Sequence, residues 1–122
     1  YFNYIYVRMG AHTLIHKRTE DDIWKNLFEL PLVETEKDLS EEEFLACPQF
    51  HALFAEGEVR MVRTLLRGVK HVLSHRVIYT NFYEVTLPDN SSSFSSYQRV
   101  AVEDLGRYAV PRLIHAFLEK YV

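Results

Sequence analysis

Two histidines and a serine stand close together in the stretch His71-Val72-Leu73-Ser74-His75. On a helix, the spacing His71-x3-His75 would direct both rings to one metal ion, but the flanking sequence is rich in β-branched and aromatic residues, which is typical of strands. Adjacent strand residues point to opposite faces, so Ser74 and His75 are poorly placed as nucleophile and base, and no Gly-x-Ser-x-Gly motif surrounds Ser74. The stretch is predicted to be a hairpin tip without a metal site.

Two further side chains, Cys47 and Trp24, have types that can carry chemistry. A single cysteine excludes an internal disulfide and a multi-cysteine metal cluster, and it indicates a reducing compartment. Cys47 precedes Pro48 at the expected end of a helix, which favours a half-buried structural thiol. Trp24 could stack on a base, but composition favours a place in the core.

Charge is divided unevenly along the chain, although the net charge is only −3. Residues 34–43 carry six acids against Lys37, for a net charge of −5, whereas residues 57–77 carry five Lys and Arg residues against Glu58, for a net charge of +4. A polyanion could meet the second segment but hardly the first, and scattered surface charge is the alternative interpretation.

Strand-like segments flank the tip and recur along the chain, which indicates the scaffold that positions it. Strands are predicted at 1–7, 12–18, 69–73, 76–87 and from 98, with a turn at Gly10. Residues 58–66 fit a strand or a helix by periodicity, and Arg67-Gly68 after them favours a strand. Ser40 and Glu43 fit a capping box, so a helix is expected to begin near residue 41. A last helix is expected after Pro111, and the polar connection 88–97 is expected to be mobile. The fold class is therefore predicted as α+β, a mixed sheet with one or two packed helices.

The length of 122 residues fits one domain with its own core. No apolar run reaches the length of a membrane span, so no membrane association is expected. The first residues already read as a strand, and the chain does not start with Met. We therefore expect residues 1–122 to be a single domain cut from a longer protein.

Three segments in this order resemble the C-terminal domain of A/G-specific adenine DNA glycosylases of the MutY type. They are "KRTEDDIWKNLFELPLVE", "GVKHVLSHRVIYTNFYEVTLP" and "VAVEDLGRYAVPRLIHAFLEKYV". The most specific elements are Asp22-Ile23-Trp24 through Leu27 to Pro31, the Leu73-Ser74-His75 tip, and Ala109-Val110-Pro111-Arg112-Leu113. The resemblance covers nearly the whole chain.

The resemblance implies a Nudix (MutT-like) fold, a mixed β-sheet packed with helices, and a role in base excision repair. Its partners would be duplex DNA with 8-oxoguanine opposite adenine and the N-terminal glycosylase domain of the same protein. Adenine excision and the iron–sulfur cluster belong to that other domain, so this part is expected to be no enzyme and to hold no cofactor. The implied location is intracellular and cytoplasmic, with the chromosome.

The tip in this family is usually Phe-Ser-His, or a relative with Thr in place of Ser. The lesion-reading residues that this implies here are Leu73, Ser74 and His75, where Leu73 keeps an apolar wedge but loses aromatic stacking. The DNA-backbone candidates close to them in sequence are Arg67, Lys70, His71 and Arg76.

Two other functions remain open from the residues. A diverged Nudix hydrolase acting on nucleoside diphosphate derivatives would use an Arg-Glu-x-x-Glu-Glu core, whereas "LVETEKDLSEEEFLA" has no glycine and no Arg-Glu pair. Glu41, Glu42 and Glu43 suit a helix N-terminus without any metal. A non-catalytic protein-interaction module is the other alternative, for which the polar loop 88–97 would offer a surface.

Overall fold

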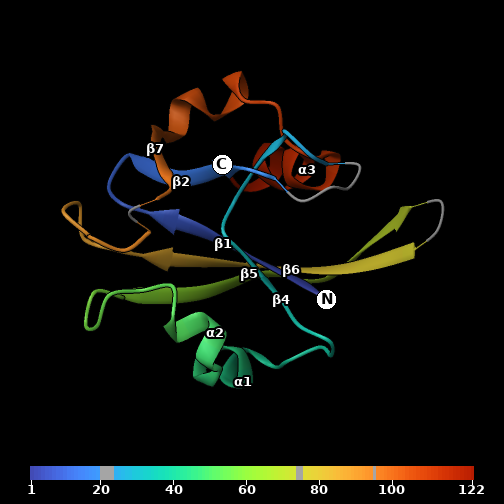
Figure 1. Cartoon of the computed structure of the whole chain (residues 1–122), viewed down its shortest axis with the longest axis horizontal. Helices are drawn as coiled ribbons and strands as arrows, with labels where there is room; N and C mark the ends of the chain where they lie inside the picture. The colour runs from blue at the N-terminus through green and yellow to red at the C-terminus, as the bar shows by residue number, and fades with distance from the viewer. Residues whose placement is uncertain (20–23, 74–75, 95) are drawn as a thin grey trace.

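A four-stranded sheet forms the middle layer of the domain in the computed structural model, which describes residues 1–19, 24–73, 76–94 and 96–122. Its strand order is β4-β1-β6-β5, and a second sheet has the order β3-β2-β7. Figure 1 shows α1 and α2 on one side of the four-stranded sheet, with the second sheet, η1 and α3 on the other. The predicted α+β class is confirmed.

The described ranges contain seven strands, three α-helices and one 3-10 helix. In chain order they are β1 (Phe2–Arg8), β2 (His12–Lys17), β3 (Phe28–Glu29), β4 (Leu32–Glu34), α1 (Glu41–Ala46), α2 (Pro48–His51), β5 (Met61–Leu73), β6 (Arg76–Thr86), β7 (Gln98–Ala101), the 3-10 helix η1 (Val102–Arg107) and α3 (Arg112–Tyr121). Strands β1 and β6 are parallel, whereas the other pairings are antiparallel.

Both faces of the four-stranded sheet are covered, so β1 is buried at six successive positions. Because strand residues alternate between faces, Tyr4 and Tyr6 pack on the α3 side while Ile5 and Val7 pack on the α1 side. Aromatic rings supply much of both cores. Phe82 stacks on Phe117 of α3 with ring centroids 4.2 Å apart, and the rings of Phe44 and Tyr83 lie 4.5 Å apart. The aromatic composition of the chain is thus used mainly in packing.

Helix α1 begins as its capping box predicts. The Glu43 N–H donates to Ser40 Oγ at 3.1 Å, and the Ser40 N–H donates to Glu43 Oε1 at 2.9 Å. This second bond holds the pKa of Glu43 below its ordinary value. Cys47 ends the helix and is half-buried, as expected, before Pro48 opens α2.

The structure differs from the sequence predictions at two short strands and at the loop from residue 88. The short strands β3 and β4 flank Leu30-Pro31 and were not predicted, because two or three residues carry too little alternation. The loop from residue 88, expected to be mobile, is held by Glu58, whose carboxylate accepts hydrogen bonds from Ser91, Ser92 and Ser93.

Helix α3 buries Leu113, Ile114 and Phe117, as expected for this amphipathic segment. No helix within the described ranges is long and apolar enough to span a membrane.

Candidate nucleic-acid interface

A long hairpin made by β5 and β6 carries most of the predicted site. Pairing continues as far as Leu73 and Arg76. Ser74, His75 and the side chain of Leu73, which make up the predicted reading tip, lie outside the described residues. Figure 1 shows the hairpin extending away from the helices at one end of the molecule.

One face of the distal hairpin points toward the α3 side of the sheet. His71 lies opposite Ile78 in the register, and its ring is 6.2 Å from the ring of Trp24. The Arg76 guanidinium carbon lies 5.7 Å from the centroid of the Phe2 ring, a cation–π distance. Trp24 itself is buried, which confirms its predicted place in the core.

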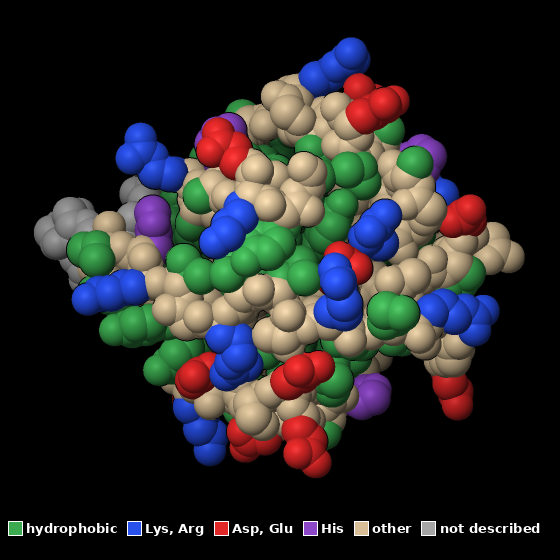
Figure 2. Space-filling model, turned by 180° about the vertical axis from the view of Figure 1, so that it is seen from behind, with side chains coloured by type: hydrophobic (Ala, Val, Ile, Leu, Met, Phe, Trp, Pro, Cys, Tyr) green, Lys and Arg blue, Asp and Glu red, His purple; other side chains and the backbone are tan. Residues whose placement is uncertain are grey.

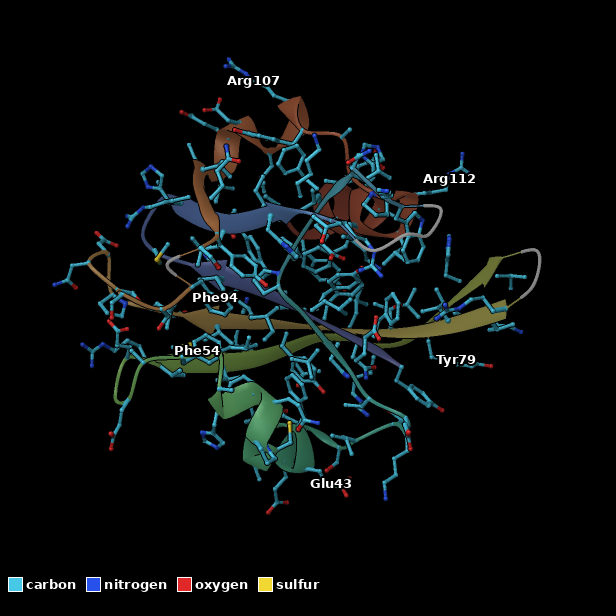
Figure 3. All side chains as sticks on the ribbon, in the orientation of Figure 1. Glu43, Phe54, Tyr79, Phe94, Arg107 and Arg112 are labelled. Carbon is cyan, nitrogen blue, oxygen red and sulfur yellow. The ribbon has the colours of Figure 1, made fainter. Side chains whose placement is uncertain are left out.

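The opposite face of the distal hairpin is exposed, because α1 and α2 cover this side of the sheet only nearer its centre. Val72 lies opposite Val77, and Lys70 lies opposite Tyr79. Val72 is 65% exposed, and Tyr79 stacks on Tyr1 with ring centroids 5.6 Å apart. Figure 3 shows Tyr79 pointing away from the α3 side. Sequence reasoning missed this apolar surface, because Val72 and Val77 share a face only through the pairing of β5 with β6.

The basic candidates do not all lie together. Lys70 and Arg76 are exposed and His71 is half-buried, and all three are within a few residues of the tip. Figure 2 shows Lys or Arg, His and hydrophobic side chains gathered at this end of the molecule. The free end of the hairpin thus combines positive charge with apolar surface.

The Arg67 side chain forms hydrogen bonds within the domain. Its guanidinium donates to the Tyr83 hydroxyl at 2.9 Å, to Asp38 Oδ1 at 2.9 Å and to the Leu39 carbonyl at 2.8 Å. Burial raises the pKa of Tyr83, and the nearby positive charge of Arg67 opposes that rise. Arg67 is therefore bound to the segment before α1, whereas Lys70 on one face and His71 and Arg76 on the other lie nearer the free end of the hairpin.

The acidic segment 34–43 offers no assembled metal site. Asp38 pairs with Arg67, and the Glu43 carboxylate is used in the capping box. Within the part of the chain that the structure describes, no group of three or more His, Cys, Asp or Glu side chains is placed to hold a metal ion.

Comparison with known families matches residues 3–120 to the NUDIX domain. The chain belongs to the NUDIX domain family. The match covers nearly the whole sequence and agrees with the mixed sheet between helices. No curated protein matches the chain. Membership of the family therefore describes the fold, while the reaction or ligand has to be argued from the hairpin and the acidic segment.

Proposed function

We propose that this NUDIX domain recognises 8-oxoguanine opposite adenine in duplex DNA, as the lesion-reading domain of an adenine DNA glycosylase in base excision repair. The observation that carries the proposal is the β5–β6 hairpin, which extends from the body with Lys70, His71 and Arg76 near its free end. NUDIX domains are found at the C-terminus of MutY-type proteins, which supports the same assignment.

The chemistry of the lesion suits a serine at the tip. Guanine presents acceptors at N7 and O6 in the major groove. Oxidation at C8 converts N7 into an N–H donor and adds a carbonyl oxygen, so a reader needs an acceptor for N7–H and a donor for the new oxygen. The Ser74 hydroxyl offers both capacities, and backbone N–H groups offer further donors. A two-point contact of this kind contributes roughly 1–3 kcal/mol of discrimination.

Phosphate contacts would orient the hairpin while its tip reads the base. Lys70 and Arg76 supply exposed cations for this purpose, and His71 supplies a further donor. Arg67 is left out of the proposed interface because its guanidinium already donates three hydrogen bonds within the domain. In the parent protein the N-terminal glycosylase domain would contribute the remaining grip on DNA and the excision chemistry.

Binding of this chain to matched duplexes tests the proposal. We expect tighter binding to a duplex with 8-oxoguanine·adenine than to one with guanine·adenine, measured by fluorescence anisotropy. Two to three phosphate contacts predict a slope of log K against log salt concentration of about −2 to −3. Equal affinities for the two duplexes across the salt series would contradict lesion recognition.

Hydrolysis of nucleoside diphosphate derivatives is the second candidate, because it has the family match in its favour. The cap formed by Ser40 and Glu43 and the absence of an Arg-Glu pair from residues 32–46 argue against it. We expect no cleavage of 8-oxo-dGTP or of a glycosidic bond by this chain. Release of nucleotide monophosphate that depends on added Mg²⁺ would establish the hydrolase instead.

A further inference from the structure

Strand β5 leaves the regular register where the distal hairpin begins. Thr64 pairs with Tyr83, Leu66 with Phe82 and Val69 with Thr80, so β5 uses two more residues than β6 over this interval. Gly68 lies inside the interval with a φ of +66°. Extra residues of this kind form β-bulges, which bend a strand and increase its twist.

Buried side chains hold this bulge. The Gly68 N–H donates to Asn81 Oδ1 at 2.8 Å, and Asn81 Nδ2 donates to Asn3 Oδ1 at 3.0 Å. Asn3 Nδ2 in turn donates to the Val33 carbonyl at 3.0 Å. Both asparagines are fully buried, so losing one partner would leave polar groups without hydrogen bonds in the core. The bulge is thereby tied across β6 and β1 to β4.

Arg67 ties the same bulge to the segment before α1. It is the residue directly before Gly68, and its guanidinium reaches Tyr83 on β6 and both Asp38 and Leu39 before α1. Asp38 Oδ1 also lies 3.4 Å from Asn81 Nδ2, so the two ties share a residue. A planar guanidinium with fixed donors suits such a junction better than a lysine.

We propose that Arg67, Gly68 and Asn81 act as positioning residues, which set the direction in which residues 69–73 and 76–79 extend beyond β1. A base-reading tip works only when it is held close to its productive geometry. The effect on DNA reading rests on the proposed function, whereas the direction of the hairpin can be measured without DNA. Arg67, which the sequence suggested as a contact for a DNA phosphate, thus serves to orient the hairpin.

Gly68→Ala is the decisive variant. A Cβ added at Gly68 meets no described atom within 4 Å, so the substitution acts only through the strain of a positive φ. Gly68→Asn is the rescue variant, since Asn adopts this conformation more readily. Gly57→Ala is the matched control, because Gly57 has a φ of +78° and equally open surroundings but lies outside the hairpin.

The direction of the hairpin is measured by electron–electron spin resonance between labels at Val72→Cys and Arg107→Cys in a Cys47→Ser background. Val72 is 65% exposed, and the Arg107 side chain is 82% exposed and points outward in Figure 3. We expect one narrow distance distribution for the parent, Gly57→Ala and Gly68→Asn, and a shifted or broadened one for Gly68→Ala. An unchanged distribution in Gly68→Ala would overturn the proposal.

Binding to the two duplexes provides the second measurement. In Gly68→Ala the preference for 8-oxoguanine·adenine should fall about tenfold, and Gly68→Asn should restore it. A shifted hairpin with an unchanged preference would refute the positioning role. If the parent shows no preference, the proposed function fails, and the distances alone then decide the inference. Should Gly68→Ala not fold, Arg67→Lys keeps the charge but not the three hydrogen bonds, and the same results are expected.

Discussion

Ser74 is the residue on which the proposed discrimination depends. A free hydroxyl can also donate to N7 of normal guanine, so Ser74 distinguishes the lesion only if its neighbours hold the hydroxyl as an acceptor. The groups that hold the Ser74 hydroxyl would come from the neighbouring tip residues and from the bound base. A serine hydroxyl can therefore donate or accept a hydrogen bond, and the groups around it decide which of the two it does.

Ser74→Ala should lower the preference for 8-oxoguanine·adenine over guanine·adenine by about 1–3 kcal/mol, because the two-point contact is lost. Binding to undamaged duplex should change little, since that contact serves the oxidised base alone. Paired anisotropy titrations of the variant and the parent measure this difference. Ser74→Thr keeps the hydroxyl and should retain the preference, and equal ratios for Ala and Ser would reject the role.

At the scale of elements, the Glu58 carboxylate helps to hold the loop from residue 88. Glu58 Oε1 accepts from Ser91 Oγ at 3.0 Å and from Ser93 Oγ at 2.9 Å. Desolvation raises the pKa of Glu58, but hydrogen bonds from Ser93, Ser91 and Ser92 outweigh it, so the pKa lies below its ordinary value. The charged form of Glu58 is thus the form that holds the loop.

This arrangement predicts a loss of stability in acid. Because the pKa of Glu58 is lower in the folded chain, its contribution is complete above the unfolded-state value of about 4.3 and disappears as the pH falls through the folded-state value. Thermal unfolding between about pH 3 and pH 7 should show a steeper acid decline in Tm for the parent than for Glu58→Gln. Glu56→Gln, an exposed neighbour, should behave like the parent. Parallel pH profiles of Tm for Glu58→Gln and the parent would show that Glu58 does not hold the loop in this way.

Long segments rich in β-branched and aromatic residues could be predicted as strands from sequence, as β1 and β6 show, and the capping box located α1 to within a residue. The bulge in β5 could not be predicted from the sequence. Arg67-Gly68 reads as the end of a strand, because a glycine that adopts positive φ is common to turns and bulges. The partner that identifies the bulge, Asn81, lies 13 residues away, and Asp38 lies 29 residues from Arg67. Charge counting along the chain cannot reveal such pairing.

For the whole molecule, a buried polar cluster around Glu29 joins the two sheets. Glu29 is 2% exposed and accepts two hydrogen bonds from Arg18 Nη1, at 3.1 and 3.0 Å. The Tyr4 hydroxyl donates to the same carboxylate at 3.1 Å from the four-stranded sheet. Burial raises the pKa of Tyr4, and the Glu29 charge adds to that rise, so the tyrosine stays protonated as a donor.

Glu29→Gln should destabilise the fold by about 3–5 kcal/mol, because it removes the buried negative charge that accepts hydrogen bonds from Arg18 and Tyr4. Tyr4→Phe removes one hydrogen bond at the same place and should cost only about 1 kcal/mol. Urea unfolding of the parent and both variants measures the two differences. Equal destabilisation by the two substitutions would show that the buried charge of Glu29 contributes nothing beyond its hydrogen bond with Tyr4.

The central place of β1 has a consequence for how the chain acquires its structure. The first strand lies between β4 and β6, and its parallel pairing joins Phe2 with Thr80 and Arg8 with Thr86. During synthesis, that edge of β1 has no partner until most of the chain has been made. Such distant pairing slows folding and leaves an apolar strand open to aggregation in the meantime. A chain cut before β6 would keep that edge open permanently.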